Sequence, residues 1–145
     1  MAFRGSFDHT LDAKNRLTIP AKFRSVLAIG VVLSKQPDEP CVGIWRPEDY
    51  EQHTKSTLSG LPPASPRAAN LRRFFFGSSM DTELDAAGRV MIPPFLMRHG
   101  ALERDVVILG AGDYLEVWDR GRWADYDKTL PEQANELTAA LEQRP

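Results

Sequence analysis

A ten-residue segment occurs twice in this 145-residue chain, and this repeat restricts the possible folds more than any other feature. Residues 11–20 read LDAKNRLTIP and residues 84–93 read LDAAGRVMIP, so six of ten positions are identical at an offset of 73. The flanks stay in phase, because the Ile44-Trp45 pair aligns with Val117-Trp118 at the same offset. Such self-similarity is typical of a chain built from two copies of one structural unit.

Each copy predicts two strands, a helix, two further strands and a closing helix. The first two strands flank a turn at Lys14-Asn15 or at Ala87-Gly88, and asparagine and glycine are the residues that most easily adopt a left-handed backbone. Pro20 and Pro93 then stand where a helix begins, a position that proline suits. The later strands are predicted at residues 31–34 and 42–45, and at residues 106–109 and 114–118.

The size of one copy argues that the two copies share a core. A unit of about 50 residues is marginally stable alone, so we expect them to interlock in one pseudo-symmetric domain of the α+β class, mainly β. The predicted division is repeat 1 at residues 5–57, a linker and connecting helix at 58–76, repeat 2 at 77–128 and a C-terminal tail helix at 129–145. The tail has Leu130, Ala134, Leu137 and Leu141 at helical spacing, so it could pack on the body, pack on a neighbouring subunit, or fray.

Charge is distributed unevenly along the chain, although its net value is only −2. Residues 1–80 carry 11 Lys/Arg against 7 Asp/Glu, whereas residues 81–145 carry 7 against 13. The basic residues are densest near the start of the chain, through Lys35. A locally basic half can attract phosphates, and the alternative is an ordinary solvated face.

Other classes of protein receive no support from the sequence. His9, His53 and His99 are isolated from Cys41 and lack metal-ligand spacing, so we expect no metal site, and no cofactor motif is present. No catalytic constellation emerges, so an enzyme is the least favoured class. The single cysteine and the lack of a long apolar run favour a cytoplasmic protein without a membrane span.

The doubled Asp-x-x-x-Arg-x-x-x-Pro signature resembles the MraZ family of bacterial transcription regulators, and the resemblance extends from Phe3 to about Trp123. It implies an AbrB-like swapped-hairpin β-barrel made from two ββαββα repeats, with peripheral helices. It also implies ring-shaped homo-oligomers in the cytoplasm, associated with the nucleoid. Such rings bind direct repeats of double-stranded DNA in the promoter of their own operon, within the division and cell-wall gene cluster, usually as repressors.

Copy one of the motif is the better candidate for DNA contact. The sequence departs from the family pattern at Asn15, where glycine is usual, and copy two has Ala87 and Met97 opposite Lys14 and Arg24. The predicted DNA-binding residues are Arg16, Lys14, Asn15, Arg4, Lys22 and Arg24. The residues assigned to structure are Asp12, Pro20, Asp85, Arg89 and Pro93.

Two alternatives remain open at this stage. Arg16 could pair with Asp12 and only fix the turn, as Arg89 and Asp85 would do in the acidic half. The chain could also be a protein-interaction module of the antitoxin type, which shares this fold and uses a tail to bind its partner. The operator sequence, the number of subunits and the choice between repression and activation do not follow from the sequence.

Overall fold

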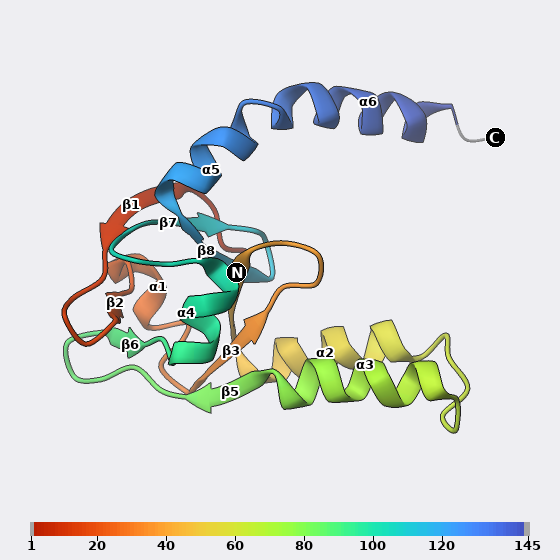
Figure 1. Ribbon diagram of the computed structural model, residues 1–145, viewed down its shortest axis with the longest axis horizontal. Helices are drawn as coiled ribbons and strands as arrows, with labels where there is room; N and C mark the ends of the chain where they lie inside the picture. Colours follow the sequence, from red (N-terminus) through yellow and green to blue (C-terminus); the bar gives the residue numbers. More distant parts are fainter. Residues whose placement is uncertain (1, 144–145) are drawn as a thin grey trace.

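The two copies of the repeat fold into the same series of elements in the computed structural model, which describes residues 2–143 (Figure 1). Copy one supplies β1 (Ser6–Thr10), β2 (Arg16–Thr18), α1 (Ala21–Arg24), β3 (Val31–Lys35), β4 (Cys41–Trp45) and α2 (Pro47–Leu58). Copy two supplies β5 (Ser79–Thr82), β6 (Arg89–Met91), α4 (Pro94–Gly100), β7 (Asp105–Gly110), β8 (Tyr114–Asp119) and α5 (Arg120–Asp127). Helix α3 (Pro66–Gly77) connects the copies, and α6 (Leu130–Glu142) follows the second one. The predicted ββαββα order is therefore present twice.

The strands of the two copies exchange partners. The main antiparallel sheet has the order β1-β7-β8-β4-β3-β5, and β2 pairs with β6 in a second, two-stranded sheet. The order is symmetric between the copies. At one edge β1 of copy one pairs with β7 of copy two, and at the other edge β5 of copy two pairs with β3 of copy one. The centre of the sheet is the pairing of β4 with β8, one strand from each copy. This arrangement interlocks the copies in one body, as the size argument predicts.

The expected closed swapped-hairpin barrel is not found among residues 2–143. The six-stranded sheet is open, with β1 and β5 at its two edges. The physical reason is that β2 and β6 are only three residues long and pair with each other, so neither connects the edge strands. The fold is better described as a mixed α and β structure with a mainly antiparallel sheet and six helices.

The hydrophobic core lies on one face of the main sheet, and α1 and α4 contribute Phe23 and Leu96 to it. Each of these helices begins directly after a proline of the repeated motif. Pro20 is the N-cap residue of α1, and Pro93 is the N-cap residue of α4. Two smaller clusters occupy the other face. One contains Trp45 and the other contains Trp118, as the alternation of side chains along a strand requires.

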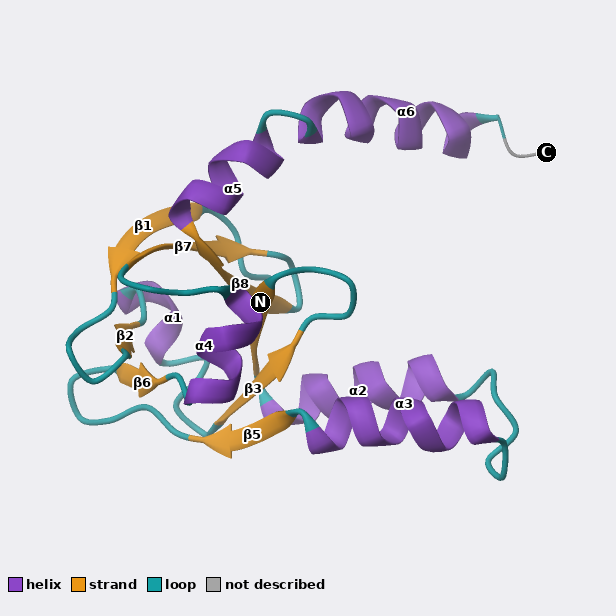
Figure 2. Ribbon diagram, viewed as in Figure 1, coloured by secondary structure: helices purple, strands orange, loops and turns teal. Residues whose placement is uncertain are grey.

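Two pairs of helices extend from the strands on the same side of the body (Figure 2). Helices α2 and α3 form an antiparallel hairpin, in which the Tyr50 hydroxyl donates to the Phe75 carbonyl at 2.9 Å. The Ser65 side chain caps α3 by accepting from the Ala68 N–H, as its position before Pro66 predicts. Helices α5 and α6 form the second projection. Within residues 2–143, no helix combines the length and the apolar character needed to cross a membrane.

Candidate nucleic-acid interface

The loop at residues 12–16 is held together by one carboxylate. Oδ1 of Asp12 accepts hydrogen bonds from the backbone N–H groups of Lys14 and Arg16, both at 2.9 Å. Oδ2 accepts a further bond from Nε of Arg16 at 2.6 Å. Asn15 has a φ of 56°, a left-handed conformation in which asparagine is enriched. Asp12 therefore fixes both the path of the loop and the side chain of Arg16.

The loop at residues 85–89 in copy two repeats this geometry. Oδ1 of Asp85 accepts from the N–H groups of Ala87 and Arg89 at 2.9 Å, and Oδ2 accepts from Nε of Arg89 at 2.9 Å. Gly88 takes the left-handed position with a φ of 77°. Because Ala87 occupies the place of Lys14, the loop geometry does not require a lysine there. The lysine of copy one is exposed and is free to serve another purpose.

Both aspartates stay ionised at neutral pH. The backbone N–H of Arg16 lowers the pKa of Asp12, and the N–H of Arg89 likewise lowers the pKa of Asp85, with help from the guanidinium groups. Nη1 of Arg89 also lies 3.9 Å from Oδ2 of Asp12, so the two ion pairs are neighbours. The site is thus a pair of adjacent carboxylate–guanidinium contacts, one from each copy.

The two loops depend on each other for their backbone hydrogen bonds. The Ile92 N–H donates to the carbonyl of Asn15 at 2.9 Å, and the Ile19 N–H donates to the carbonyl of Gly88 at the same distance. These contacts place the loops at the two ends of the short β2–β6 ribbon. The arrangement forms only when both copies are folded and interlocked.

Arg24 contacts the loop of the other copy. Its Nε donates to the Ile19 carbonyl at 2.9 Å, and its guanidinium group lies over Gly88, where an added Cβ would be 2.5 Å from Nε. The equivalent helix in copy two has Met97 in place of the arginine. Arg24 therefore leaves no room for a side chain at position 88.

The remaining predicted DNA-binding residues, Lys22 and Arg4, lie outside the loop. Nζ of Lys22 lies over the rings of Phe7 and Phe23, at 4.7 Å and 5.0 Å from their centroids. Arg4 is exposed, but strand β1 separates it from the loop by five residues, or about 16 Å. The structure therefore groups Lys14, Asn15 and Arg16 closely and does not bring Arg4 beside them.

Comparison with known proteins identifies the family. A family model described as "MraZ protein, putative antitoxin-like" matches residues 2–73 and again residues 75–144. The chain belongs to the MraZ family. A protein from Limosilactobacillus fermentum named transcriptional regulator MraZ is 36% identical over 140 residues, covering 97% of this chain and 96% of that protein. A protein of the same name from Heliobacterium modesticaldum is 35% identical over 139 residues, covering 96% of each chain.

One basic residue beside the loop was missed by sequence reasoning. Arg104 of this MraZ-family chain is exposed, and its carbonyl accepts a hydrogen bond from the Leu11 N–H at 2.8 Å. It lines a shallow hollow together with Asp12 and Asn15. No local signal could reveal it, because Arg104 lies in the acidic half and reaches the loop only through the pairing of β1 with β7.

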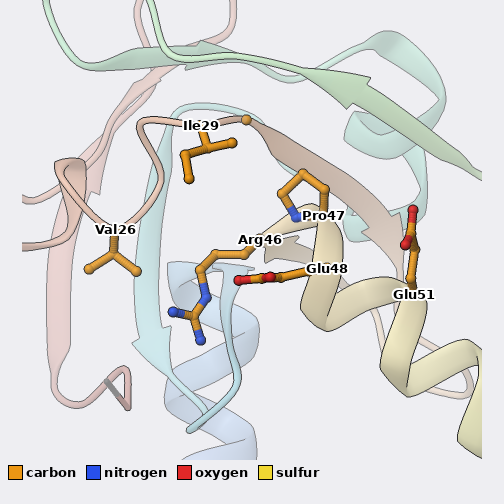
Figure 3. A pocket seen from close by; sticks show the side chains of 7 residues that line it. Val26, Ile29, Arg46, Pro47, Glu48 and Glu51 are labelled. Carbon is orange, nitrogen blue, oxygen red and sulfur yellow. The ribbon is translucent and has the colours of Figure 1, made fainter.

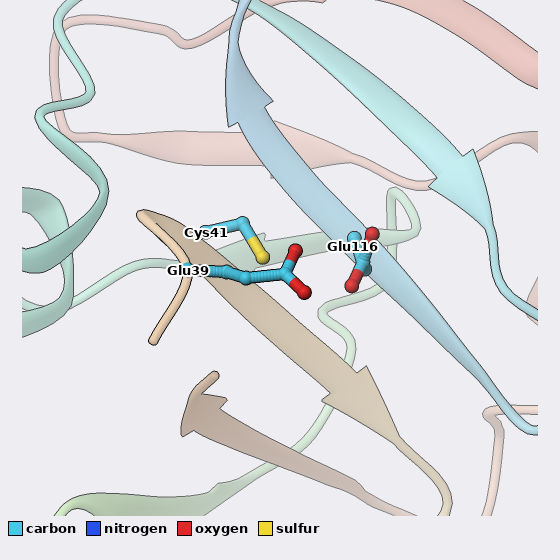
Figure 4. A group of neighbouring side chains, drawn as sticks. All are labelled: Glu39, Cys41 and Glu116. Carbon is cyan, nitrogen blue, oxygen red and sulfur yellow. The ribbon is translucent and has the colours of Figure 1, made fainter. Parts of the chain in front are cut away.

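A second cluster away from the loops was also not predicted. The ligand atoms of Glu39, Cys41 and Glu116 lie within 4.8 Å of one another (Figure 4). Burial, followed by the charges of the two carboxylates, raises the pKa of the Cys41 thiol, which favours a protonated sulfur. Oε1 of Glu116 already accepts from Nε1 of Trp118 at 3.1 Å. Burial, followed by the charge of Glu116, also raises the pKa of Glu39, so the charges of this cluster disfavour one another.

Proposed function

We propose that this chain is a sequence-specific DNA-binding transcriptional regulator. It would act as a repressor at the promoter of its own operon, in the division and cell-wall gene cluster. The names of its relatives support transcriptional regulation. The observation that carries DNA binding is the loop at residues 12–16, where exposed Lys14 stands beside an arginine held by Asp12.

The geometry of Arg16 suits recognition of a base. Asp12 holds Nε of Arg16 and so orients the guanidinium plane, while the two terminal nitrogens can still donate. An arginine with this freedom can bind the O6 and N7 atoms of guanine in the major groove. Lys14 would contact a phosphate, which supplies affinity and fixes the register. Fixing the loop through Asp12 and contacting DNA through Arg16 are therefore compatible roles.

The two copies would contribute unequally to this function. Copy one has Lys14 and Arg24 where copy two has Ala87 and Met97, so copy one is the proposed contact and copy two completes the fold. We place the protein in the cytoplasm at the nucleoid, as a homo-oligomeric ring without cofactor or catalytic activity. A ring presents one copy-one loop per subunit to direct repeats of double-stranded DNA. Weak individual contacts then add through their effective concentration.

Replacing each of the two equivalent arginines, Arg16 and Arg89, by alanine tests the proposal. Arg16→Ala should weaken binding to the DNA upstream of the protein's own gene by about 5- to 150-fold, the effect of losing about 1–3 kcal/mol of base contact. Arg89→Ala removes the equivalent ion pair in copy two, together with the 3.9 Å approach of Arg89 to Asp12, and is the control, with a change of less than about 3-fold expected. Band shifts at fixed salt measure both, with a scrambled DNA of equal length as reference. Equal losses in the two variants, or no loss for Arg16→Ala, would overturn the assignment.

An antitoxin-type interaction module is the second candidate. The observation that favours it is α6, in which Leu137 and Leu141 remain 67% and 57% exposed. Such a module would capture a stoichiometric partner protein through its tail and would leave the upstream DNA unbound at moderate salt. A pull-down combined with the band shift separates the two functions.

A further inference from the structure

The basic excess of residues 1–80 lies in the segment from Gln52 to Met80. From Gln52 to Met80 the chain has four basic residues and no acidic one, whereas residues 1–51 have seven of each. This stretch is most of the α2–α3 hairpin, and the basic residues are Lys55, Arg67, Arg72 and Arg73. The first turns of α2 carry Glu48, Asp49 and Glu51, so the positive charge of the hairpin lies at the end of α2 and along α3.

The outward face of α3 also exposes an aromatic side chain. Ala68 and Phe75 are buried against the rest of the protein, but Phe76, on another side of the helix, is 54% exposed. Arg72 and Arg73 precede it and are both exposed. We call these three residues, Arg72, Arg73 and Phe76, the α3 face. An exposed aromatic residue flanked by arginines has the composition of a protein-interaction surface.

Helix α6 has the complementary properties. Its apolar stripe consists of Leu130, Ala134, Leu137 and Leu141, and none of the described residues of α6 is buried. The helix carries Glu132, Glu136 and Glu142 and no basic residue between Leu130 and Glu142. An isolated helix of 13 residues is marginal in water, so its stability depends on packing of the apolar face.

We propose that the leucine stripe of α6 packs on the α3 face of a second copy of this chain. The two surfaces do not meet within one chain of this structure, because α6 and the α2–α3 hairpin leave the body as separate projections (Figure 1). Leu137 and Leu141 would bury Phe76, and the acidic side chains of α6 would lie near Arg72 and Arg73. The inference rests on the proposed homo-oligomer and identifies its contact surfaces.

The charge pattern favours the α3 face over a second exposed apolar site, beside α1. A hollow beside α1 contains Val26 and Ile29, the latter 95% exposed, and it is bordered by Glu48 and Glu51 (Figure 3). These carboxylates would repel the acidic helix α6, even though Arg46 lies among them. On the α3 face, the exposed apolar residue is flanked by arginines instead of glutamates. Ile29 therefore provides a matched negative control.

This contact would have a defined consequence for assembly. Every copy carries both surfaces, and the two surfaces differ, so the contact is heterologous and joins copies head to tail. A heterologous contact forms a ring when its rotation closes. In Figure 1 the proposed DNA-binding loop, between β1 and β2, lies at the end of the body opposite the two projections, so assembly would leave it accessible.

Cysteine cross-linking tests the contact in the full chain. We expect the double variant Phe76→Cys, Leu137→Cys to form a ladder of disulfide-linked chains on mild oxidation, because each copy bonds to the next. Native Cys41 is fully buried and should not interfere. The control Ile29→Cys, Leu137→Cys offers a more exposed partner position and should remain mostly single-chain. An equal or stronger ladder from the control, or the absence of a ladder from the first variant, overturns the inference.

Charge reversal supplies the second measurement. Arg73→Glu and Glu136→Arg should each weaken self-association at least 10-fold in light scattering, and their combination should recover part of that loss. If Arg73→Glu instead lowers DNA affinity and leaves the particle mass unchanged, the α3 face is a nucleic-acid site and the inference is wrong. Assembly that persists in Leu137→Glu refutes this contact alone, whereas a monomeric wild type also refutes the proposed ring. Promoter binding is judged separately through Arg16→Ala.

Discussion

Substitution of Gly88 by alanine should destabilise the protein through two separable effects. Gly88 has a φ of +77°, a conformation that is unfavourable for residues with a Cβ. An added Cβ would also lie 2.5 Å from Nε and 2.6 Å from Cδ of Arg24. Arg24 must then move away and lose its hydrogen bond to the carbonyl of Ile19, which is 2.9 Å long.

The magnitude follows from these two terms. The left-handed backbone costs alanine about 1–2 kcal/mol. A hydrogen bond from a charged donor contributes about 1.5–3 kcal/mol, and the partial exposure of Arg24 favours the lower end of that range. We therefore expect Gly88→Ala to lower the free energy of unfolding by about 2.5–4 kcal/mol. Gly112 is a matched control, since its φ is +86° and an added Cβ would lie in open space, with no neighbouring side chain or backbone within 4 Å. Gly112→Ala should therefore show the cost of the left-handed backbone alone.

Urea unfolding at one fixed protein concentration measures the difference, because assembly would otherwise shift the transition. In the wild-type background, Gly88→Ala should cost at least about 1 kcal/mol more than Gly112→Ala. In an Arg24→Ala background that excess should disappear, because the displaced side chain is already absent. Equal costs in the wild-type background, or an excess that survives Arg24→Ala, would refute the role given to Arg24.

Three further predictions concern pH and buried groups. The pKa values of Asp12 and Asp85 are lowered in the folded protein, so these carboxylates stabilise the fold fully above the ordinary aspartate pKa. This stabilisation is lost as the pH falls toward the lowered pKa values. Denaturation at several acid pH values should show the loss, and the loss should be smaller in the double variant Asp12→Asn, Asp85→Asn. Ser34→Ala leaves the buried indole N–H of Trp45 without its 3.1 Å acceptor and should cost about 1–3 kcal/mol in thermal unfolding, and unchanged stability would contradict this. Burial raises the pKa of the Cys41 thiol, so a thiol reagent at neutral pH should label it only on unfolding, and rapid labelling in native buffer would disprove its seclusion.

The motif was the part of the site most accessible to sequence reasoning. Asp12 and Arg16 are four residues apart on either side of a turn, and such local contacts follow from spacing and turn chemistry. The alternative that Arg16 pairs with Asp12 is realised in the structure, and the same pair in copy two shows that it does not depend on Lys14. What spacing could not reveal was the approach of Arg104, which depends on strand pairing across 93 residues of sequence.

The sequence by itself determined the doubled ββαββα order, the turns at Asn15 and Gly88, and the helices that follow Pro20 and Pro93. These features arise from backbone preferences and from side-chain periodicity, which act over a few residues. Only the tertiary structure decided that the main sheet is open, since closure depends on whether the short ribbon of β2 and β6 connects the sheet edges. It also decided that Arg24 covers the opposite copy's turn and that α3, with Arg67, Arg72 and Arg73 and no acidic residue, projects from the body. Long-range pairing sets these contacts, and no local propensity encodes it.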